Sequence, residues 1–364
     1  MTRPPLTASP LPHDPLHERP NRGFHPLIEG EQPYVFVDGC MQIWPDADLP
    51  YAHRHGCDVY AVTALSVQVD VGRALSDLMY WHAVVREHPN LRIAYTVEDI
   101  VQAKAAGQAG LLLASQDGEF IGAAPERVEA FQRLGLRMLI PAYNRDNLLC
   151  GGVLEQTDTG LSGLGRAVVA ECDRVGVLLD LSHVSRRSSL EINEASANPT
   201  VFSHANPKGL VDNARNVDDE QIRAVASKGG VIGTVNWGPL VFKQGMTARP
   251  TLADYLDHVD YLADLLGTTE NIGIGTDFSL GSYPRHDHDK HGPHYKTVMT
   301  DMNEHVTTYW RAPERFVAGF ECYPQILDVY DGLRGRGYSE DDIRGIAGGN
   351  FMRVFASVWP GAGV

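Results

Sequence analysis

Two histidines and one aspartate stand directly after short apolar segments of the kind that form buried strands. His183 ends the run LDLSH, His204 ends VFSH, and Asp277 ends IGIGTD. Neutral imidazole is a good ligand for zinc and related ions. A carboxylate beside it can bind the same ion or accept a proton from water. The sequence therefore predicts that these three side chains share one cation.

Apolar, β-rich runs recur along the whole chain, with helical patterns between them. The eight runs are Tyr34–Val37, Val59–Val69, Leu111–Ser115, Arg137–Ala142, Val177–Ser182, Thr200–Ser203, Val231–Val235 and Ile272–Thr276. The helical patterns include Gly165–Val175, Asp218–Ser227, Leu252–Leu266 and Glu340–Ile346. Strands that alternate with helices predict a parallel sheet, and eight such units predict an α/β fold of the (β/α)8 TIM-barrel class. A doubly wound open sheet is the structural alternative.

The barrel explains why the polar residues stand where they do, because barrel enzymes place their chemistry at the carboxyl ends of the strands. The residues just past the runs are Asp38-Gly39-Cys40-Met41-Gln42, Gln116-Asp117, Tyr143-Asn144, His183, His204, Asn236-Trp237 and Asp277. Any one of them alone is as readily a polar group of a loop. Two histidines and an aspartate together favour a site.

The chain has 364 residues and is 43% hydrophobic, which is enough to build one large core. Residues 1–30 are Pro-rich and lack an apolar signal segment, so we expect an extended N-terminal arm rather than a secretory signal. Residues 31–364 are then a single barrel. A long loop after the last strand, at about residues 279–320, contains four closely spaced histidines, and we interpret it as a lid over the barrel mouth.

Charge and cysteine usage exclude several kinds of partner. The 31 Lys and Arg against 46 Asp and Glu give a net charge of −15, which argues against nucleic acid and against an anionic membrane surface. No apolar run is long enough to span a bilayer. The five cysteines contain no CxxC pair, which favours a reduced, cytoplasmic setting.

Taken in order, the motifs SHVS, FSHANP, ARNVDDE, GIGTDF and GNFMRVF resemble the membrane (renal) dipeptidase family, whose barrels belong with the amidohydrolase-like metal hydrolases. The resemblance runs from about Tyr34 to the C-terminus. It implies a zinc-dependent hydrolase of dipeptide-like substrates, and a homodimer. Family members hold two zinc ions on an HxD pair after strand 1, a bridging Glu after strand 3, His after strands 5 and 6, and Asp after strand 8.

Several of these ligand positions are changed in this chain. Cys40 stands where the family has the first His, Gln42 where it has the first Asp, and Gln116 where it has the bridging Glu. Of three carboxylates only Asp277 remains, so the resemblance implies that the two-metal site is lost. Asp117, one residue further, would point away from the barrel mouth in a regular strand, and we expect it to be a loop or capping group.

We therefore expect one divalent ion, most simply zinc, on His183 and His204. Asp277 is either its third ligand or the catalytic base for a bound water. Cys40 and Gln116 are further candidate ligands, since zinc accepts sulfur and an amide oxygen can bind a cation. For Cys40 we favour the alternative of a buried, inert thiol, because free cysteines are commonly buried.

The resemblance also implies residues that contact a substrate with a carboxylate. Arg215 aligns with the family arginine that holds the carboxylate, which a guanidinium can bind through two hydrogen bonds. The alternative for Arg215 is a surface ion pair with Asp218 or Asp219. Tyr143 stands where the family often has a His that stabilises the transition state, so it is a candidate catalytic residue, and with Asn144 a candidate substrate contact.

Three functions remain open at this point. The first is a hydrolase in which a metal-activated water attacks a small carboxylate-bearing amide. The second is a tailoring enzyme of specialised metabolism, such as an isomerase, a lyase or an oxidative enzyme. The third is a binding barrel without catalysis. A fold does not determine a reaction, and the changed ligands are compatible with all three functions.

Overall fold

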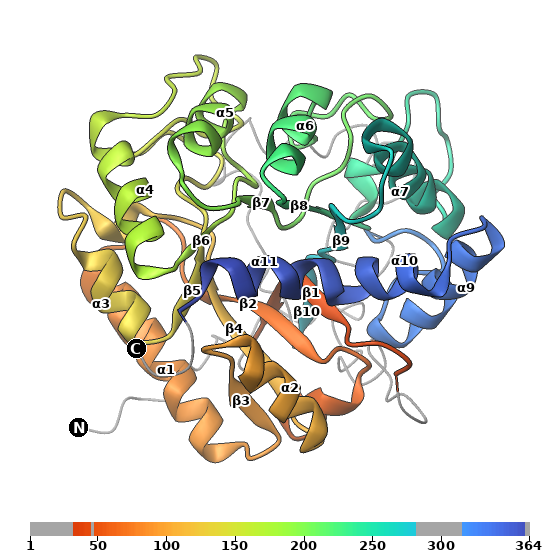
Figure 1. The fold of residues 1–364 in the computed structure, drawn as a ribbon, viewed down its shortest axis with the longest axis horizontal. Coiled ribbons are helices and arrows are strands. Elements are labelled where there is room, and N and C mark those ends of the chain that lie inside the picture. Colours follow the sequence, from red (N-terminus) through yellow and green to blue (C-terminus); the bar gives the residue numbers. More distant parts are fainter. Residues whose placement is uncertain (1–31, 45–46, 282–314, 361–364) are drawn as a thin grey trace, which may run out of the picture.

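Eight parallel strands form a nearly closed barrel in a computed structural model of the protein, which describes residues 32–44, 47–281 and 315–360 (Figure 1). The strands are β1 (Val37–Ile43), β2 (Val59–Leu65), β4 (Ala109–Ser115), β5 (Leu136–Leu139), β6 (Leu178–Leu179), β7 (Val201–Phe202), β8 (Val231–Thr234) and β9 (Ile272–Ile274). Their order is β6-β5-β4-β2-β1-β9-β8-β7, and a parallel bridge between Asp180 and Val201 joins β6 to β7. The predicted (β/α)8 class is confirmed, and the open sheet is excluded.

Helices surround the ring of strands (Figure 1). They are α1 (Val71–Glu87), α2 (Val97–Ala105), α3 (Arg127–Arg133), α4 (Gly163–Val175), α5 (Arg186–Ala195), α6 (Asp219–Ser227), α7 (Leu252–Leu266), α9 (Ile326–Gly335), α10 (Glu340–Arg344) and α11 (Asn350–Val358). Capping boxes begin α2, α6, α7 and α10, in which the first residue and the third helical residue satisfy each other's backbone N–H groups. Helix α7 has the bounds that the sequence predicts.

Short elements complete the barrel. They are β3 (Leu91–Ile93), which pairs with β4, β10 (Phe278–Leu280), which pairs with β1, the 3-10 turns η2 (Leu49–Arg54), η3 (Glu119–Ile121), η4 (Gly238–Leu240) and η6 (Tyr323–Gln325), and the π-turn η7 (Gly345–Gly349). The π-turn follows α10 directly, so the helix predicted over Glu340–Ile346 ends as a regular α-helix at Arg344.

The first strand differs from the sequence prediction, which places it at Tyr34–Val37. In the structure β1 starts at Val37, so Asp38, Cys40 and Gln42 lie within the strand rather than after it. The prediction is wrong because backbone pairing decides the element: β1 pairs in parallel with β2, β9 and β10, and these partners outweigh the low strand propensity of an Asp-Gly sequence.

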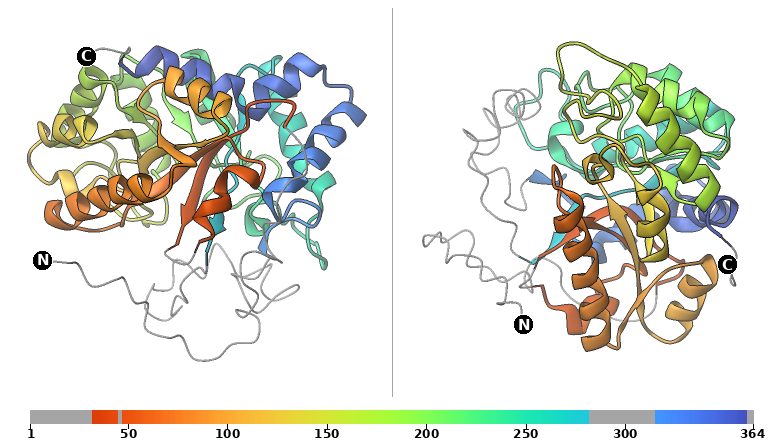
Figure 2. Two further views of the ribbon diagram at one scale, coloured as in Figure 1. Left: turned by 90° about the horizontal axis from the view of Figure 1, so that it is seen from below. Right: turned by 90° about the vertical axis from the view of Figure 1, so that its left-hand side faces the viewer.

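Helix α11 closes one end of the barrel, opposite the carboxyl end of β1 (Figure 2). Its Phe351 is fully buried among the strands. Three strand glycines make room for the ring, because a Cβ atom at Gly39, Gly233 or Gly273 would lie 2.8, 3.2 or 2.5 Å from it. The chemistry-bearing residues are thereby left at the other, open end.

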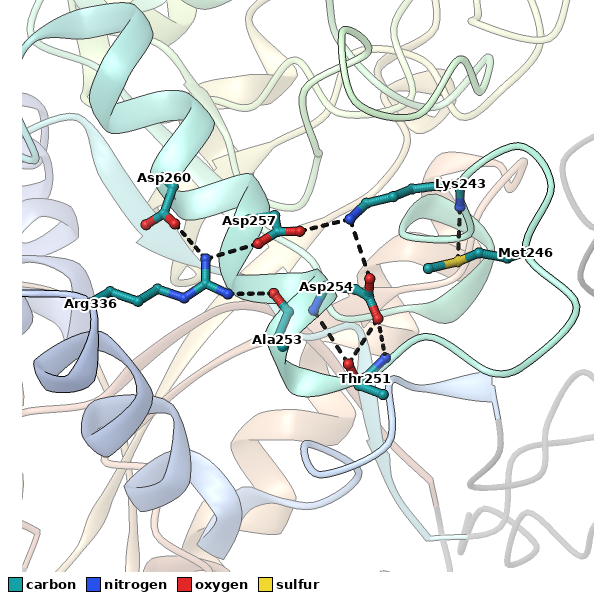
Figure 3. A network of polar contacts seen from close by, with 8 residues as sticks. All are labelled: Lys243, Met246, Thr251, Ala253, Asp254, Asp257, Asp260 and Arg336. Carbon is teal, nitrogen blue, oxygen red and sulfur yellow. Dashed lines mark hydrogen bonds and ion pairs between the residues drawn. The ribbon is translucent and has the colours of Figure 1, made fainter.

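A network of charges fixes the outer face of α7 (Figure 3). Asp257 lies between two cations: its Oδ2 is 2.7 Å from Lys243 Nζ, and its Oδ1 is 2.9 Å from Arg336 Nη1. Lys243 also pairs with Asp254, and Arg336 with Asp260. The network ties the segment after β8 and the end of α9 to one helix.

Some predictions fall on residues outside the described part of the chain. They are the arm at residues 1–30 and most of the loop at about residues 279–320, of which β10 and the segment from Arg315 onward are described. The division into an arm and one barrel domain stays a prediction. Among the described residues, no helix is both long and apolar enough to cross a membrane.

The glycine-lined cavity around Phe351 predicts a large loss of stability on truncation. We expect Phe351→Ala to lower the free energy of unfolding by about 3–5 kcal/mol. The surrounding glycines have no side chains that could move into the cavity left by the ring. Urea unfolding followed by circular dichroism measures it. The control Leu327→Ala removes a side chain that is 38% exposed on α9. Equal losses in the two variants would contradict the role of Phe351.

Candidate functional site

His183 and His204 meet at the open end of the barrel. They follow β6 and β7, and their Nε2 atoms lie 2.9 Å apart. Both side chains are buried, at 7% and 2% exposure. Burial, and then the positive charge of Arg215, lower the pKa of both imidazoles well below the ordinary value. The structure thus brings together two neutral rings whose outer nitrogens point at each other.

Each ring is held from behind by an oxygen atom. His183 Nδ1 is 2.7 Å from Asn144 Oδ1, and His204 Nδ1 is 2.8 Å from Ser203 Oγ. His183 itself has a left-handed backbone with φ +66°, which turns its side chain out of the strand direction. The positions of both rings are therefore set by hydrogen bonds as well as by packing.

Tyr143 and Asn144 follow β5 and lie against the first histidine. The Tyr143 ring stacks on the His183 ring with centroids 4.2 Å apart and an angle of 30° between the planes. Asn144, which has φ +63°, directs its side-chain oxygen at the same imidazole. Both residues line the site, and their contact with a substrate stays a prediction.

Asp277 lies between β9 and β10, where a left-handed backbone with φ +57° interrupts the strand. Its backbone N–H donates to Cys40 O over 2.8 Å, and its Oδ1 accepts a hydrogen bond of 2.9 Å from Gln42 Nε2. Loss of hydration raises the pKa of its carboxyl to about 7, against the opposing charge of Arg215. A carboxyl group with a pKa near neutrality can both accept and donate a proton.

Cys40 and Gln116 contact each other instead of the histidine pair. Gln116 Nε2 donates to Thr63 Oγ1 over 2.7 Å and to Cys40 Sγ over 3.3 Å. Burial raises the pKa of the Cys40 thiol well above its usual value, and the side chain is 3% exposed. These contacts describe a protonated, buried thiol, which is the alternative that the sequence favours for Cys40.

The donor set at the barrel mouth can be compared with what a metal ion requires. Two converging, neutral imidazole nitrogens suit a divalent cation of the zinc type. In residues 32–44, 47–281 and 315–360, no three His, Cys, Asp or Glu side chains are grouped to hold a metal. The histidine pair therefore offers two nitrogen ligands, and within this part of the chain neither Asp277 nor another carboxylate is grouped with them.

Arg215 points into the site. It is 6% exposed, and its Nη2 donates to His183 Nε2 over 3.1 Å and to His204 O over 3.5 Å. Asp218, a candidate partner in the sequence-based alternative, accepts from the exposed Arg186. A cavity of about 200 Å³ opens between the loops that follow β5, β6 and β7, and both Arg215 and His183 line it.

Buried carboxylates that sequence reasoning missed support this arrangement. Asp38 is fully buried in β1 and accepts hydrogen bonds from Thr276 N over 2.7 Å and from Tyr323 OH over 2.8 Å, as well as from the Thr276 hydroxyl. Burial raises its pKa to about 6, and the hydrogen bonds oppose the shift. Asp38 thereby ties β1 to Thr276, the residue before Asp277. Its strand position was the available signal, and the misplaced first strand hid it.

Asp117 has a supporting role in a loop. It accepts from Gln68 N over 2.7 Å, from Glu119 N over 3.2 Å and from Asn147 Nδ2 over 3.1 Å. These three donors lie in the segments that follow β2, β4 and β5. Asp117 thus joins loops around the site, in keeping with the loop-capping role expected from the sequence.

Comparison with known proteins gives a consistent family. The chain is 28% identical over 238 residues to an uncharacterized dipeptidase of Schizosaccharomyces pombe (65% of this chain, 50% of that protein). It is 24% identical over 270 residues to dipeptidase tcpJ of Claviceps purpurea (74% of this chain, 55% of that protein). The chain thus spans about half the length of these curated relatives.

A solved structure covers more of the molecule. The crystal structure of an amidohydrolase from Pseudomonas aeruginosa matches with a TM-score of 0.76 and 28% identity, over 90% of this chain and 97% of that one. A family model described as membrane dipeptidase, peptidase family M19, matches residues 55–308. This match spans more than half of the chain and includes both histidines, Arg215 and Asp277. The chain therefore belongs to the membrane dipeptidase family, peptidase family M19, as its sequence motifs predict.

Proposed function

We propose that the protein is a metal-dependent hydrolase that cleaves a small amide or dipeptide-like substrate bearing a carboxylate. The observation that carries this proposal is the pair of imidazole nitrogens 2.9 Å apart, with the guanidinium of Arg215 3.1 Å from the His183 nitrogen. Family membership supports the same reaction class. When bound at this pair, a divalent ion supplies Lewis-acid activation of the scissile carbonyl and of water.

Arg215 would fix the substrate in the site. Its guanidinium presents paired N–H donors that match the two oxygens of a carboxylate, so one end of the substrate is oriented. The cavity of about 200 Å³ beside it has room for a small group and is lined at its outer part by Lys208. Because the buried arginine holds the carboxylate, the amide of the bound substrate is positioned beside the histidine pair.

Two further residues would handle protons and charge. Asp277, with its pKa raised to about 7 by desolvation, would accept a proton from water and return it to the leaving amine. Tyr143, which stacks on His183, would donate a hydrogen bond as negative charge develops on the carbonyl oxygen. Asn144 is proposed to act mainly through His183, which it contacts.

One ion, and specifically zinc, is proposed in place of the pair typical of the family. The glutamines at two former carboxylate positions donate amide N–H groups to neighbouring side chains: Gln42 to Asp277 and Gln116 to Cys40. The Gln42 oxygen is engaged as well, because it accepts from Ser279 Oγ over 3.4 Å. An N–H donor repels a cation and cannot bridge two of them. Imidazole ligands favour zinc over magnesium or calcium.

The setting of the protein is proposed from its composition. All five cysteines are free thiols, which agrees with a reduced, cytoplasmic compartment. The net charge of −15 argues against nucleic acid and anionic membranes as partners. A homodimer is proposed from the family resemblance alone.

A second candidate, favoured by the same two glutamines, is a tailoring enzyme whose reaction is no longer hydrolysis. A panel of dipeptides and N-acyl amino acids, assayed with added zinc, separates the two. Release of free amino acids supports the hydrolase. No release from any member of the panel, by a protein that holds zinc, would contradict it and favour a changed reaction or a binding function.

The metal count gives a direct test. We expect elemental analysis of purified, zinc-loaded protein to find one equivalent, and His183→Ala and His204→Ala to lose it, since each removes half of the described donor pair. Cys40→Ser serves as the control and should retain the ion, because the Cys40 sulfur accepts a hydrogen bond from Gln116 Nε2 instead of contacting the histidine pair. Two equivalents in the unchanged protein would refute the single-ion site.

Substitution of the arginine tests substrate binding. We expect Arg215→Met to lower kcat/KM for dipeptides by about 100-fold, mostly through KM, because a carboxylate loses a charge-assisted pair of hydrogen bonds worth about 3 kcal/mol. Steady-state kinetics measure the effect. Arg174→Met, which breaks an exposed ion pair on α4, should have no effect. An unchanged kcat/KM in Arg215→Met counts against the proposed role.

A further inference from the structure

The inner nitrogens of the two imidazoles both face atoms that accept hydrogen bonds. His183 Nδ1 lies 2.7 Å from the side-chain oxygen of Asn144. An amide oxygen has lone pairs and no proton, so it can only accept. The proton of a neutral His183 ring must therefore reside on Nδ1, which leaves Nε2 unprotonated, as an acceptor for the Arg215 N–H group 3.1 Å away.

The second ring is controlled through a serine. His204 Nδ1 lies 2.8 Å from Ser203 Oγ, and the Ser203 hydroxyl also contacts Asp180 Oδ2. A carboxylate accepts and a hydroxyl has one proton to give, so Ser203 donates to Asp180 and accepts from the ring. His204 then also has its proton on Nδ1, and its Nε2 is likewise unprotonated.

We propose that Asp180, acting through Ser203, and Asn144 are positioning residues that fix both imidazoles as Nδ1–H tautomers, so that two unprotonated Nε2 atoms face one point. The inference rests on the histidine pair of the proposed function and deepens it. Two unprotonated nitrogens 2.9 Å apart cannot form an N–H···N hydrogen bond with each other. The two rings therefore do not satisfy each other, and both Nε2 atoms remain acceptors, as the Arg215 N–H group shows at His183.

The position of Asp180 makes the arrangement directional. Its Oδ1 accepts from the backbone N–H groups of Ser182 and Ser203, each over 3.0 Å, while Oδ2 receives the Ser203 hydroxyl. The side chain is fully buried, so these donors have no water to replace their acceptor. The Oδ1 position must remain a hydrogen-bond acceptor for the two backbone N–H groups. Only the atom at the Oδ2 position can be exchanged for a donor.

The hydrogen bonds that run from His204 Nδ1 through Ser203 to Asp180 form a relay. The substitution Asp180→Asn uses the constraint on Oδ1 to reverse the direction of this relay. The asparagine oxygen must stay with the two backbone N–H groups, so its amide nitrogen faces Ser203 Oγ and donates to it. Ser203 then donates to His204 Nδ1, which moves the ring proton to Nε2. The variant is nearly isosteric and removes a buried charge, so the fold is retained, as thermal unfolding can verify.

Two readouts test the reversal, and neither needs a substrate. In metal-free protein labelled with nitrogen-15 histidine, we expect His204 Nε2 to change from a bare, pyridine-like shift to a protonated, pyrrole-like shift in Asp180→Asn. Zinc affinity, measured by competition with a chelator, should fall about 10- to 100-fold. An unchanged His204 shift with unchanged zinc affinity in a folded variant would overturn the proposal.

Matched variants separate positioning from mere packing. Thr200→Val removes a buried hydroxyl just before β7 that donates to Asn193 Oδ1 rather than to Asp180, Ser203 or His204, so zinc affinity and the ring shifts should stay as they are. Ser203→Ala, should Asp180→Asn not fold, leaves His204 Nδ1 without its acceptor and should give a mixture of tautomers. Loss of zinc binding in Thr200→Val equal to that in Ser203→Ala would refute the relay. A protein that hydrolyses no dipeptide, yet shows these shifts, would sink the proposed function and support the relay.

Discussion

The site depends on how the barrel is closed between its two shortest strands. β6 and β7 have two residues each, and the bridge between Asp180 and Val201 is what joins them. The two histidines leave the barrel immediately after these strands, so the spacing of their rings is inherited from that single junction. Asp180 takes part twice, through its backbone in the bridge and through its carboxylate in the contacts with Ser182 and Ser203. The same contacts of Asp180 therefore close the barrel and align the two imidazoles.

Charge inside the barrel is distributed in an unusual way for a metal-binding family. The fully buried carboxylates, Asp38 and Asp180, accept hydrogen bonds from backbone N–H and hydroxyl groups. At the mouth, Gln42 and Gln116 present N–H groups at positions where the sequence resemblance implies acids. The local positive charge comes from Arg215, which adds to burial in lowering the pKa of both histidines. Such a site can neutralise only a small amount of added positive charge, and this limit is the physical reason for expecting a changed stoichiometry.

Sequence reasoning succeeded where a pattern is repeated and failed where a contact is unique. The eight-fold alternation and the capped, amphipathic segment Leu252–Leu266 predict the barrel and α7, because periodicity reports burial. The start of β1 was missed, since backbone pairing and not composition decides it. His183, His204 and Arg215 could be named from the motifs. The hydrogen bonds of Asn144, Ser203 and Asp180, which determine what the rings can bind, join strands far apart in the chain and leave no local pattern.

The aromatic ring that seals the glycine-lined end of the barrel belongs to α11, which follows every strand of the described residues in the sequence. During synthesis on the ribosome these strands emerge before Phe351 does, so their shared interior stays unfilled until that residue has been made. The end of the barrel can therefore pack only after all of its described strands are available. Chains that stop short of α11 expose this interior to chaperones and proteases.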